Sequence, residues 1–149
     1  TNRLLIADME PSMFMSLLLL RWDVEEKSLY YCGAGHERLL IFRAMQGRVE
    51  DRPSGGIVLG AVADVDSMLE EMSLDLDTGD AVLLYTDGVT EARNKRGEEF
   101  GLDRLKILLE AYGNLPPNQL VEHILKKIRA FADTHDQHDD ITLVAIKRI

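Results

Sequence analysis

The chain has 149 residues, of which 46% are hydrophobic and 29% charged, a balance typical of a globular domain with a core. Its formal net charge of −9 disfavours nucleic acid or an anionic membrane as a partner, because both are bound through Lys and Arg clusters that the sequence lacks. A single cysteine excludes an intrachain disulfide. With no secretory signal and no apolar run long enough to span a bilayer, the sequence favours a cytoplasmic protein.

The first third of the chain is expected to form β-hairpins after a short helix. Residues 1–8 predict the tail of a helix that Pro11 ends. Four short runs predict strands, at residues 14–23, 29–32, 39–42 and 48–50. A polar turn separates the first two runs and Gln46-Gly47 separates the last two, so we expect two hairpins. Residues 52–60 are rich in Pro and Gly and predict a loop.

Two further strands are predicted in the middle of the chain. Residues 72–77 alternate between apolar and polar, which is typical of a strand with one wet face. Residues 81–85 are a continuous apolar run, which is typical of a strand buried on both faces. The turn at Asp77-Thr78-Gly79-Asp80 lies between them, so we expect a hairpin over residues 67–85.

The last third of the chain predicts two helices followed by one strand. Apolar residues recur at helical spacing over residues 102–112, and again from Pro117 to Phe131. Residues 141–146 are an apolar run and predict the final strand. Strands that precede a helix pair indicate an α+β fold with mainly antiparallel sheets.

Acidic residues stand at the ends of two predicted core strands. Asp87 follows the strand at 81–85, and Gly88 after it would let backbone or ligand approach closely; Asp139 and Asp140 precede the final strand. If the two strands are antiparallel neighbours, these carboxylates lie at one rim of a sheet. Mg²⁺ and Mn²⁺ prefer such oxygen ligands, and two ions about 3.5–4 Å apart would hold a hydroxide for attack on phosphorus. The alternative is a pair of unrelated acidic surface turns.

Histidines offer a second candidate chemistry. His135 and His138 precede Asp139 and Asp140, and such a group would suit Zn²⁺ or Fe, although a solvated loop is the interpretation that we favour. His36 follows a Gly-Ala-Gly segment. It would either act as an acid or shape the site, or have its hydrogen bonds satisfied by nearby backbone.

Several segments together resemble one protein family. They are YYCGAGHERLLIF, GGIVLGAV, LDTGDAVLLYTDGVTEARNKRGEEFG and HDDITLVAI. In this order they resemble the C-terminal two-thirds of the SpoIIE-type phosphatases, which belong to the metal-dependent serine/threonine phosphatases of type 2C (the PPM superfamily). NRLLIADMEPSMFMSLLL is similar to the helix tail and strand that lead into that region, so the resemblance covers essentially the whole chain.

The resemblance implies two packed antiparallel sheets flanked by helices, with Mn²⁺ or Mg²⁺ at one end. It implies that a metal-bridged water hydrolyses phosphoserine or phosphothreonine on a protein, usually a STAS-type anti-sigma factor antagonist, downstream of a sensor or receiver domain in bacterial signalling. By this resemblance Asp87 and Asp139 are catalytic metal ligands, Asp140 is an alternate ligand, and Gly88 lies beside the metal.

The sequence departs from the family pattern at its start. The first metal-binding aspartate of the family, in an early Gly-Asp block, is absent, and Gly79-Asp80 matches a different Gly-Asp pair in the turn before residue 81. We therefore expect residues 1–149 to be a single, N-terminally incomplete phosphatase domain with a partial two-metal site. It should bind metal weakly, be poorly active, and expose a sheet edge prone to self-association. The alternative is a non-catalytic relative that binds and sequesters a partner protein.

Overall fold

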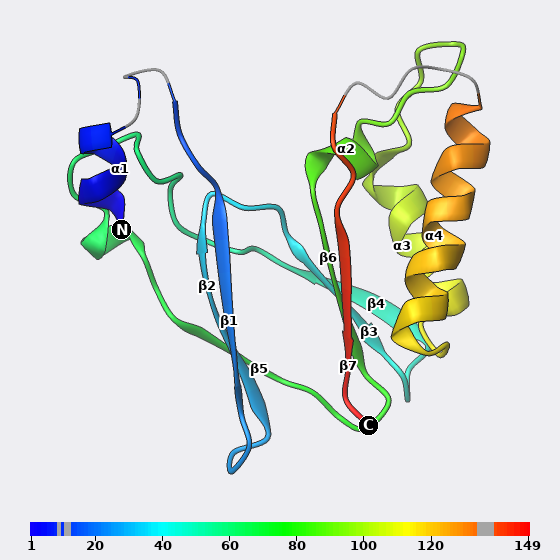
Figure 1. Cartoon of the computed structure of the whole chain (residues 1–149). Coiled ribbons are helices and arrows are strands. Elements are labelled where there is room, and N and C mark those ends of the chain that lie inside the picture. Colours follow the sequence, from blue (N-terminus) through cyan, green and yellow to red (C-terminus); the bar gives the residue numbers. More distant parts are fainter. Residues whose placement is uncertain (9, 11–12, 134–138) are drawn as a thin grey trace. The chain divides into compact units, whose positions relative to one another are not determined.

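The computed structural model describes residues 1–8, 10, 13–133 and 139–149, which form two compact units. Unit 1 comprises residues 1–36 and 53–76, and unit 2 comprises residues 37–52 and 77–149. Each unit has its own antiparallel sheet, three-stranded in unit 1 and four-stranded in unit 2 (Figure 1). No described helix is both long enough and apolar enough to cross a bilayer.

Unit 1 consists of a short helix, a 3-10 turn and the sheet β1-β2-β5. Its elements are α1 (Asn2–Asp8), β1 (Leu17–Asp23), β2 (Ser28–Ala34), η1 (Asp66–Met68) and β5 (Met72–Asp75). The predicted first hairpin is confirmed, with β1 and β2 antiparallel. The predicted N-terminal helix is confirmed as well, and Pro11, expected to end it, lies outside the described residues.

Hydrogen bonds of one buried side chain hold α1 in place. Asn2 Nδ2 donates to the Val62 carbonyl oxygen at 2.9 Å, and Asn2 Oδ1 accepts from the Gly60 amide at 2.8 Å. In the sheet of unit 1, β1 is an edge strand and carries the exposed side chains of Leu19 and Trp22. Self-association through such an edge stays a prediction.

Unit 2 consists of the sheet β4-β3-β6-β7 and the helices packed on it. Its elements are β3 (Leu39–Arg43), β4 (Arg48–Arg52), β6 (Ala81–Tyr85), α2 (Asp87–Thr90), α3 (Gly101–Tyr112), α4 (Pro117–Ala132) and β7 (Leu143–Lys147). The predicted second hairpin, both long helices and the final strand are confirmed.

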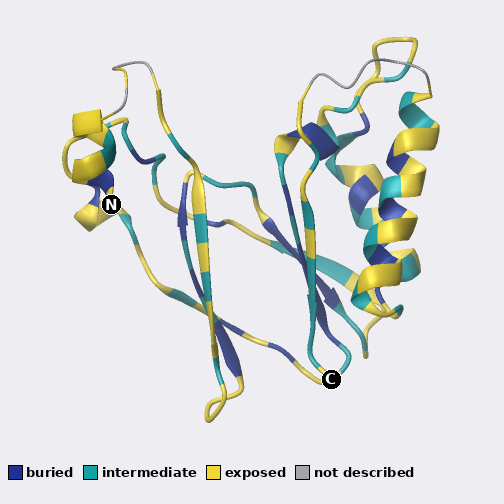
Figure 2. Cartoon of the chain, viewed as in Figure 1, coloured by how far each residue is buried: buried dark blue, intermediate teal, exposed yellow. Residues whose placement is uncertain are grey.

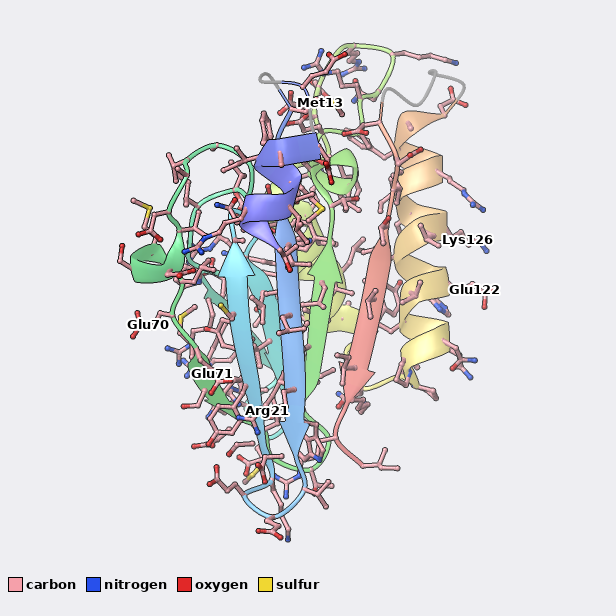
Figure 3. All side chains as sticks on the ribbon, turned by 60° about the vertical axis from the view of Figure 1, so that its left-hand side comes forward. Met13, Arg21, Glu70, Glu71, Glu122 and Lys126 are labelled. Carbon is pink, nitrogen blue, oxygen red and sulfur yellow. The ribbon has the colours of Figure 1, made fainter. Side chains whose placement is uncertain are left out.

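The core of unit 2 lies between α3, α4 and one face of the sheet. Its buried side chains come from strands and helices alike, and they include Leu40, Phe42, Leu83, Tyr85, Leu105, Leu109, Leu120, Ile124 and Ile128 (Figure 2). Each buried side chain of this size contributes about 1.5–3 kcal/mol to folding. The opposite face of α4 is polar, and Glu122 and Lys126 point outward from it, one helical turn apart (Figure 3).

The predicted hairpin over residues 67–85 is wrong. Strand β5 pairs with β2 in unit 1, whereas β6 pairs with β3 and β7 in unit 2. The turn between them belongs to unit 2, because the buried Asp80 carboxylate accepts hydrogen bonds from the Ala44 amide at 2.8 Å and from Arg43 Nη1 at 2.9 Å. The turn therefore attaches to the β3–β4 connection and does not fold β6 back onto β5.

Candidate active site

The topology of unit 2 brings the predicted acidic residues to one rim of its sheet. Strands β6 and β7 are antiparallel neighbours, with Tyr85 opposite Leu143. The end of β6, followed by Asp87, therefore lies beside the start of β7, preceded by Asp139 and Asp140. Figure 1 shows α2 and the start of β7 at the same end of unit 2. The two acidic turns are thus neighbours and not unrelated surface features.

Thr86 joins the two acidic segments. Its amide donates to the Thr142 carbonyl oxygen at 3.2 Å. Its hydroxyl donates to the Asp140 carbonyl oxygen at 3.0 Å and accepts from the Thr142 amide, also at 3.0 Å. The sequence interpretation missed this residue. The available signal was a hydroxyl side chain placed between an apolar strand and an acidic residue.

Gly88 brings the backbones of the two acidic segments together. A Cβ atom added at this position would overlap the Asp140 carbonyl group and come within 3.3 Å of the Asp139 carbonyl carbon. The expected close backbone approach at Gly88 is therefore confirmed. Asp87-Gly88 does not form an isolated turn, because Asp87 begins the short helix α2 and its carbonyl oxygen accepts from the Glu91 amide at 2.8 Å.

The three carboxylates at this rim are exposed to solvent. Asp87 Oδ1 accepts a hydrogen bond from the Gly88 amide at 3.0 Å, and Asp139 Oδ1 accepts one from the Asp140 amide at 2.7 Å. These bonds orient each carboxylate against its own backbone. The rim therefore presents oriented anionic oxygens to solvent, an arrangement suited to a hard cation.

Of the other residues considered in the sequence, His36 and Asp80 lie within the described part of the chain. His36 belongs to unit 1, where its carbonyl oxygen accepts a hydrogen bond from the buried Ser54 hydroxyl. His135 and His138 lie outside the described residues. Asp80 is buried in the turn before β6 and is engaged there by backbone and arginine donors.

The pKa of Asp80 fits a structural role. Burial acts to raise this pKa, but hydrogen bonds from the Ala44 amide, the Arg43 guanidinium and the Asp77 amide outweigh burial. The result is a pKa below the ordinary value for an aspartate. Asp80 is therefore a buried anion, and its carboxylate accepts hydrogen bonds from its own turn, from the last residue of β3 and from the β3–β4 connection.

The whole chain, residues 1–149, matches the model of the family described as Stage II sporulation protein E (SpoIIE). The chain belongs to the SpoIIE family. It is 28% identical over 149 residues to the phosphoserine phosphatase RsbU of Bacillus subtilis, a match that covers 99% of this chain and 43% of RsbU. The chain thus spans less than half the length of that relative.

Solved structures confirm the predicted fold of this SpoIIE-family chain. The SiaA-PP2C domain of Pseudomonas aeruginosa matches with a TM-score of 0.80 and 22% identity, over 97% of this chain and 55% of that domain. The Mn-presoaked phosphatase domain of SpoIIE from Bacillus subtilis matches with a TM-score of 0.66 and 17% identity, over 89% of this chain and 56% of that domain. Both likenesses show an α+β PP2C fold with two antiparallel sheets and helices.

The PP2C fold implies a divalent metal ion, and the donors at the rim fit such an ion in kind. Asp87, Asp139 and Asp140 supply carboxylate oxygens, which Mg²⁺ and Mn²⁺ prefer. However, the described part of the chain contains no group of three or more His, Cys, Asp or Glu side chains placed to hold a metal ion.

Proposed function

We propose that this chain is the catalytic part of a metal-dependent protein serine/threonine phosphatase. The observation that carries the proposal is the joining of Asp87 to the Asp139-Asp140 segment by Thr86 and Gly88, at one rim of a buried sheet. Family membership supports it, since the relative RsbU is named a phosphoserine phosphatase and a SpoIIE phosphatase domain was soaked with manganese.

In this proposal Asp87 and Asp139 hold Mn²⁺ or Mg²⁺, with Asp140 as an alternate ligand and Gly88 beside the ion. When bound, the ion supplies a water activated for attack on phosphorus. The protein contributes fixed geometry, because the Thr86 hydroxyl and the close approach at Gly88 hold the two carboxylate-bearing segments together. Because the rim is exposed, a phosphorylated side chain on another protein can reach it.

The substrate of this activity is phosphoserine or phosphothreonine on a regulatory protein. We infer a STAS-type anti-sigma factor antagonist, with a sensor or receiver domain upstream in a cytoplasmic bacterial signalling protein. This inference rests on the family and not on any contact within the chain. In this proposal the three carboxylates form only one part of the metal centre, so we expect weak metal binding and low activity from this chain alone.

A metal centre that is only partial would suit a second candidate function, in which a non-catalytic SpoIIE-family domain binds and sequesters a partner protein. Such a domain would keep its fold and its binding surface but would not turn over a phosphoprotein. The two functions differ in whether phosphate is released.

The deciding experiment measures Mn²⁺-dependent phosphate release from a phosphoserine protein, with this chain and with any longer form of the protein. Asp87→Asn should abolish release, whereas Asp103→Asn, at an exposed position of α3, should leave it unchanged. Equal release by Asp87→Asn and the unmodified protein would contradict the phosphatase proposal. Binding of the phosphoprotein without any release of phosphate would support the second function.

A further inference from the structure

Strand β3 also begins at the rim that carries the candidate site. Strands β3 and β6 are antiparallel neighbours, with Leu40 opposite Leu83. If this pairing is extended by two residues beyond Leu40 and Leu83, Arg38 lies opposite Tyr85. Tyr85 precedes Asp87 by two residues. The charged groups nearest the start of β3 therefore belong to the same end of the sheet as the acidic residues.

Arg38 is part of a three-residue charge cluster that no step of the proposed function uses. Arg38 Nη2 donates to Asp51 Oδ1 at 2.8 Å, and Lys106 Nζ donates to Asp51 Oδ2 at 2.5 Å. The three side chains come from the start of β3, from β4 and from α3. They are 43%, 27% and 30% exposed in the order Arg38, Asp51, Lys106, so solvent reaches all of them.

Asp51 holds both cations in position, and both cations keep N–H donors that Asp51 does not use. Hydrogen bonds from Lys106 and Arg38 hold the pKa of the Asp51 carboxyl below its ordinary value, so this anchor remains ionised at neutral pH. A guanidinium has five N–H donors and an ammonium three, and Asp51 takes one from each. Among the described residues, Asp51 is the sole partner of both cations.

The neighbourhood of Tyr85 gives independent support for this placement. Burial raises the pKa of Tyr85 to about 12, and the charged groups that act on its phenol are Glu37, Arg38 and Asp51. The cluster therefore lies within electrostatic range of the last residue of β6.

A fixed arginine at an acidic rim has a clear chemical use. A phosphorylated substrate is anionic, and the carboxylates of Asp87, Asp139 and Asp140 repel it at a rim of a chain whose net charge is −9. Arginine binds phosphate through two parallel N–H···O bonds, and a lysine ammonium adds a point charge. Cations at this end of the sheet offset the repulsion where a phosphate must approach.

We propose that Arg38, assisted by Lys106 and held in position by Asp51, binds the phosphate of the phosphorylated substrate residue. This inference rests on the proposed phosphatase function and adds a substrate-binding group to it. Arg38 and Lys106 contact the phosphate, whereas Asp51 is a positioning residue. The same cluster also links β3 and β4 to α3, so the test must separate binding from stability.

The test uses the 149-residue chain without metal and follows its nitrogen-15 NMR spectrum. The probes are a short peptide with one phosphoserine and its unphosphorylated twin. The phosphopeptide should shift the Arg38 Nε–Hε resonance, and Arg38→Gln should weaken binding at least fivefold. Arg38→Lys keeps the charge without the planar fork and should give an intermediate affinity. Lys106→Gln should weaken binding less than Arg38→Gln.

The matched control is Arg48→Gln. Arg48 begins β4 at the opposite end of the same sheet, opposite Arg43, and pairs with Glu50 at 2.9 Å. This variant should bind the phosphopeptide as the unmodified chain does. A thermal melt of each variant reports stability, and if Arg38→Gln fails to fold, then Arg38→Lys and Lys106→Gln carry the comparison.

Three results would overturn the inference: equal affinity for Arg38→Gln and the unmodified chain, equal affinity for the two peptides, or no phosphopeptide binding at millimolar concentration. These outcomes are independent of the phosphatase test, because no metal is present and no turnover is measured. If the phosphatase proposal is wrong, no phosphate is released from the phosphoprotein. The phosphopeptide can still bind through Arg38 in that case.

Discussion

Gly88 in α2 lies so close to the carbonyl group of Asp140 that any side chain at position 88 would overlap it. The same carbonyl oxygen accepts the Thr86 hydroxyl at 3.0 Å. Two acidic segments far apart in the sequence are therefore joined by close backbone packing and by the Thr86 hydroxyl, and not by their carboxylates. The geometry of the rim follows from this contact, and disturbing it should affect stability and metal binding together.

Gly88→Ala is the most direct disturbance of this contact. The added methyl group must push the Asp140 carbonyl away or shift α2, and such overpacking costs about 1–3 kcal/mol. We expect that loss in the free energy of unfolding measured with urea, accompanied by weaker Mn²⁺ binding. Glu91→Ala, exposed at the end of the same helix, should change neither quantity. A Gly88→Ala protein with unchanged stability and unchanged Mn²⁺ affinity would contradict the prediction.

Thr86→Val tests the hydroxyl separately from the shape of the side chain. The change removes the bond to the Asp140 carbonyl and the bond from the Thr142 amide, and each such bond contributes about 1 kcal/mol. We expect a loss of about 1–2 kcal/mol in the free energy of unfolding. Thr86→Ser keeps the hydroxyl and should recover most of that loss. Equal stability of the Val and Ser variants would show that the hydroxyl contributes nothing.

Much of the fold could be predicted because its signals are local. The apolar run at Ala81–Tyr85 identified a buried strand, and helical spacing located α3 and α4. The rim could also be predicted, since it required only that β6 and β7 be antiparallel neighbours. The residue roles at that rim remain proposals, because the sequence offers the acids but not the geometry of a bound ion.

The error over residues 67–85 has a physical cause. The turn at 77–80 has hairpin chemistry, but the buried Asp80 takes its hydrogen bonds from Arg43 and Ala44, which lie far away in the sequence. No local pattern indicates that partnership, so the sequence could not show that β5 and β6 enter different sheets. Helix α2 was missed for a similar reason, since four residues are too few to display a helical period.

Lys147 is predicted to stabilise the connection between α3 and α4. Its Nζ atom donates to the carbonyl oxygens of Gly113, Asn114 and Leu115 at 2.9, 2.8 and 3.2 Å. A cation here also complements the negative C-terminal end of α3. Lys147→Met keeps the aliphatic stem and should lower the free energy of unfolding by about 2 kcal/mol. Lys127→Met on the exposed face of α4 is the control, and equal melting temperatures for the two variants would contradict this role.

Asp80→Asn should destabilise unit 2 strongly. Asn has nearly the same shape, but it removes the buried negative charge that Arg43 Nη1 contacts at 2.9 Å. Breaking one side of a buried ion pair costs about 3–5 kcal/mol, and we expect a loss at the lower end of this range because Arg43 keeps its ion pair with Glu50 at 3.1 Å. Urea denaturation at pH 7 measures this loss. Asp103→Asn in α3 is the exposed control and should change the free energy of unfolding by less than about 0.5 kcal/mol.

The pH dependence of stability provides a second test of Asp80. Its pKa is lower in the folded chain than in the unfolded chain, so the unfolded state binds more protons as the solution becomes acidic. The stabilisation is fully present above the unfolded pKa, about 3.9, and is lost as the pH falls through the folded pKa. Between pH 5 and pH 2 the unmodified chain should therefore lose stability more steeply than Asp80→Asn, as measured by urea titrations at each pH. Parallel curves for the two proteins would show that Asp80 does not contribute to acid unfolding.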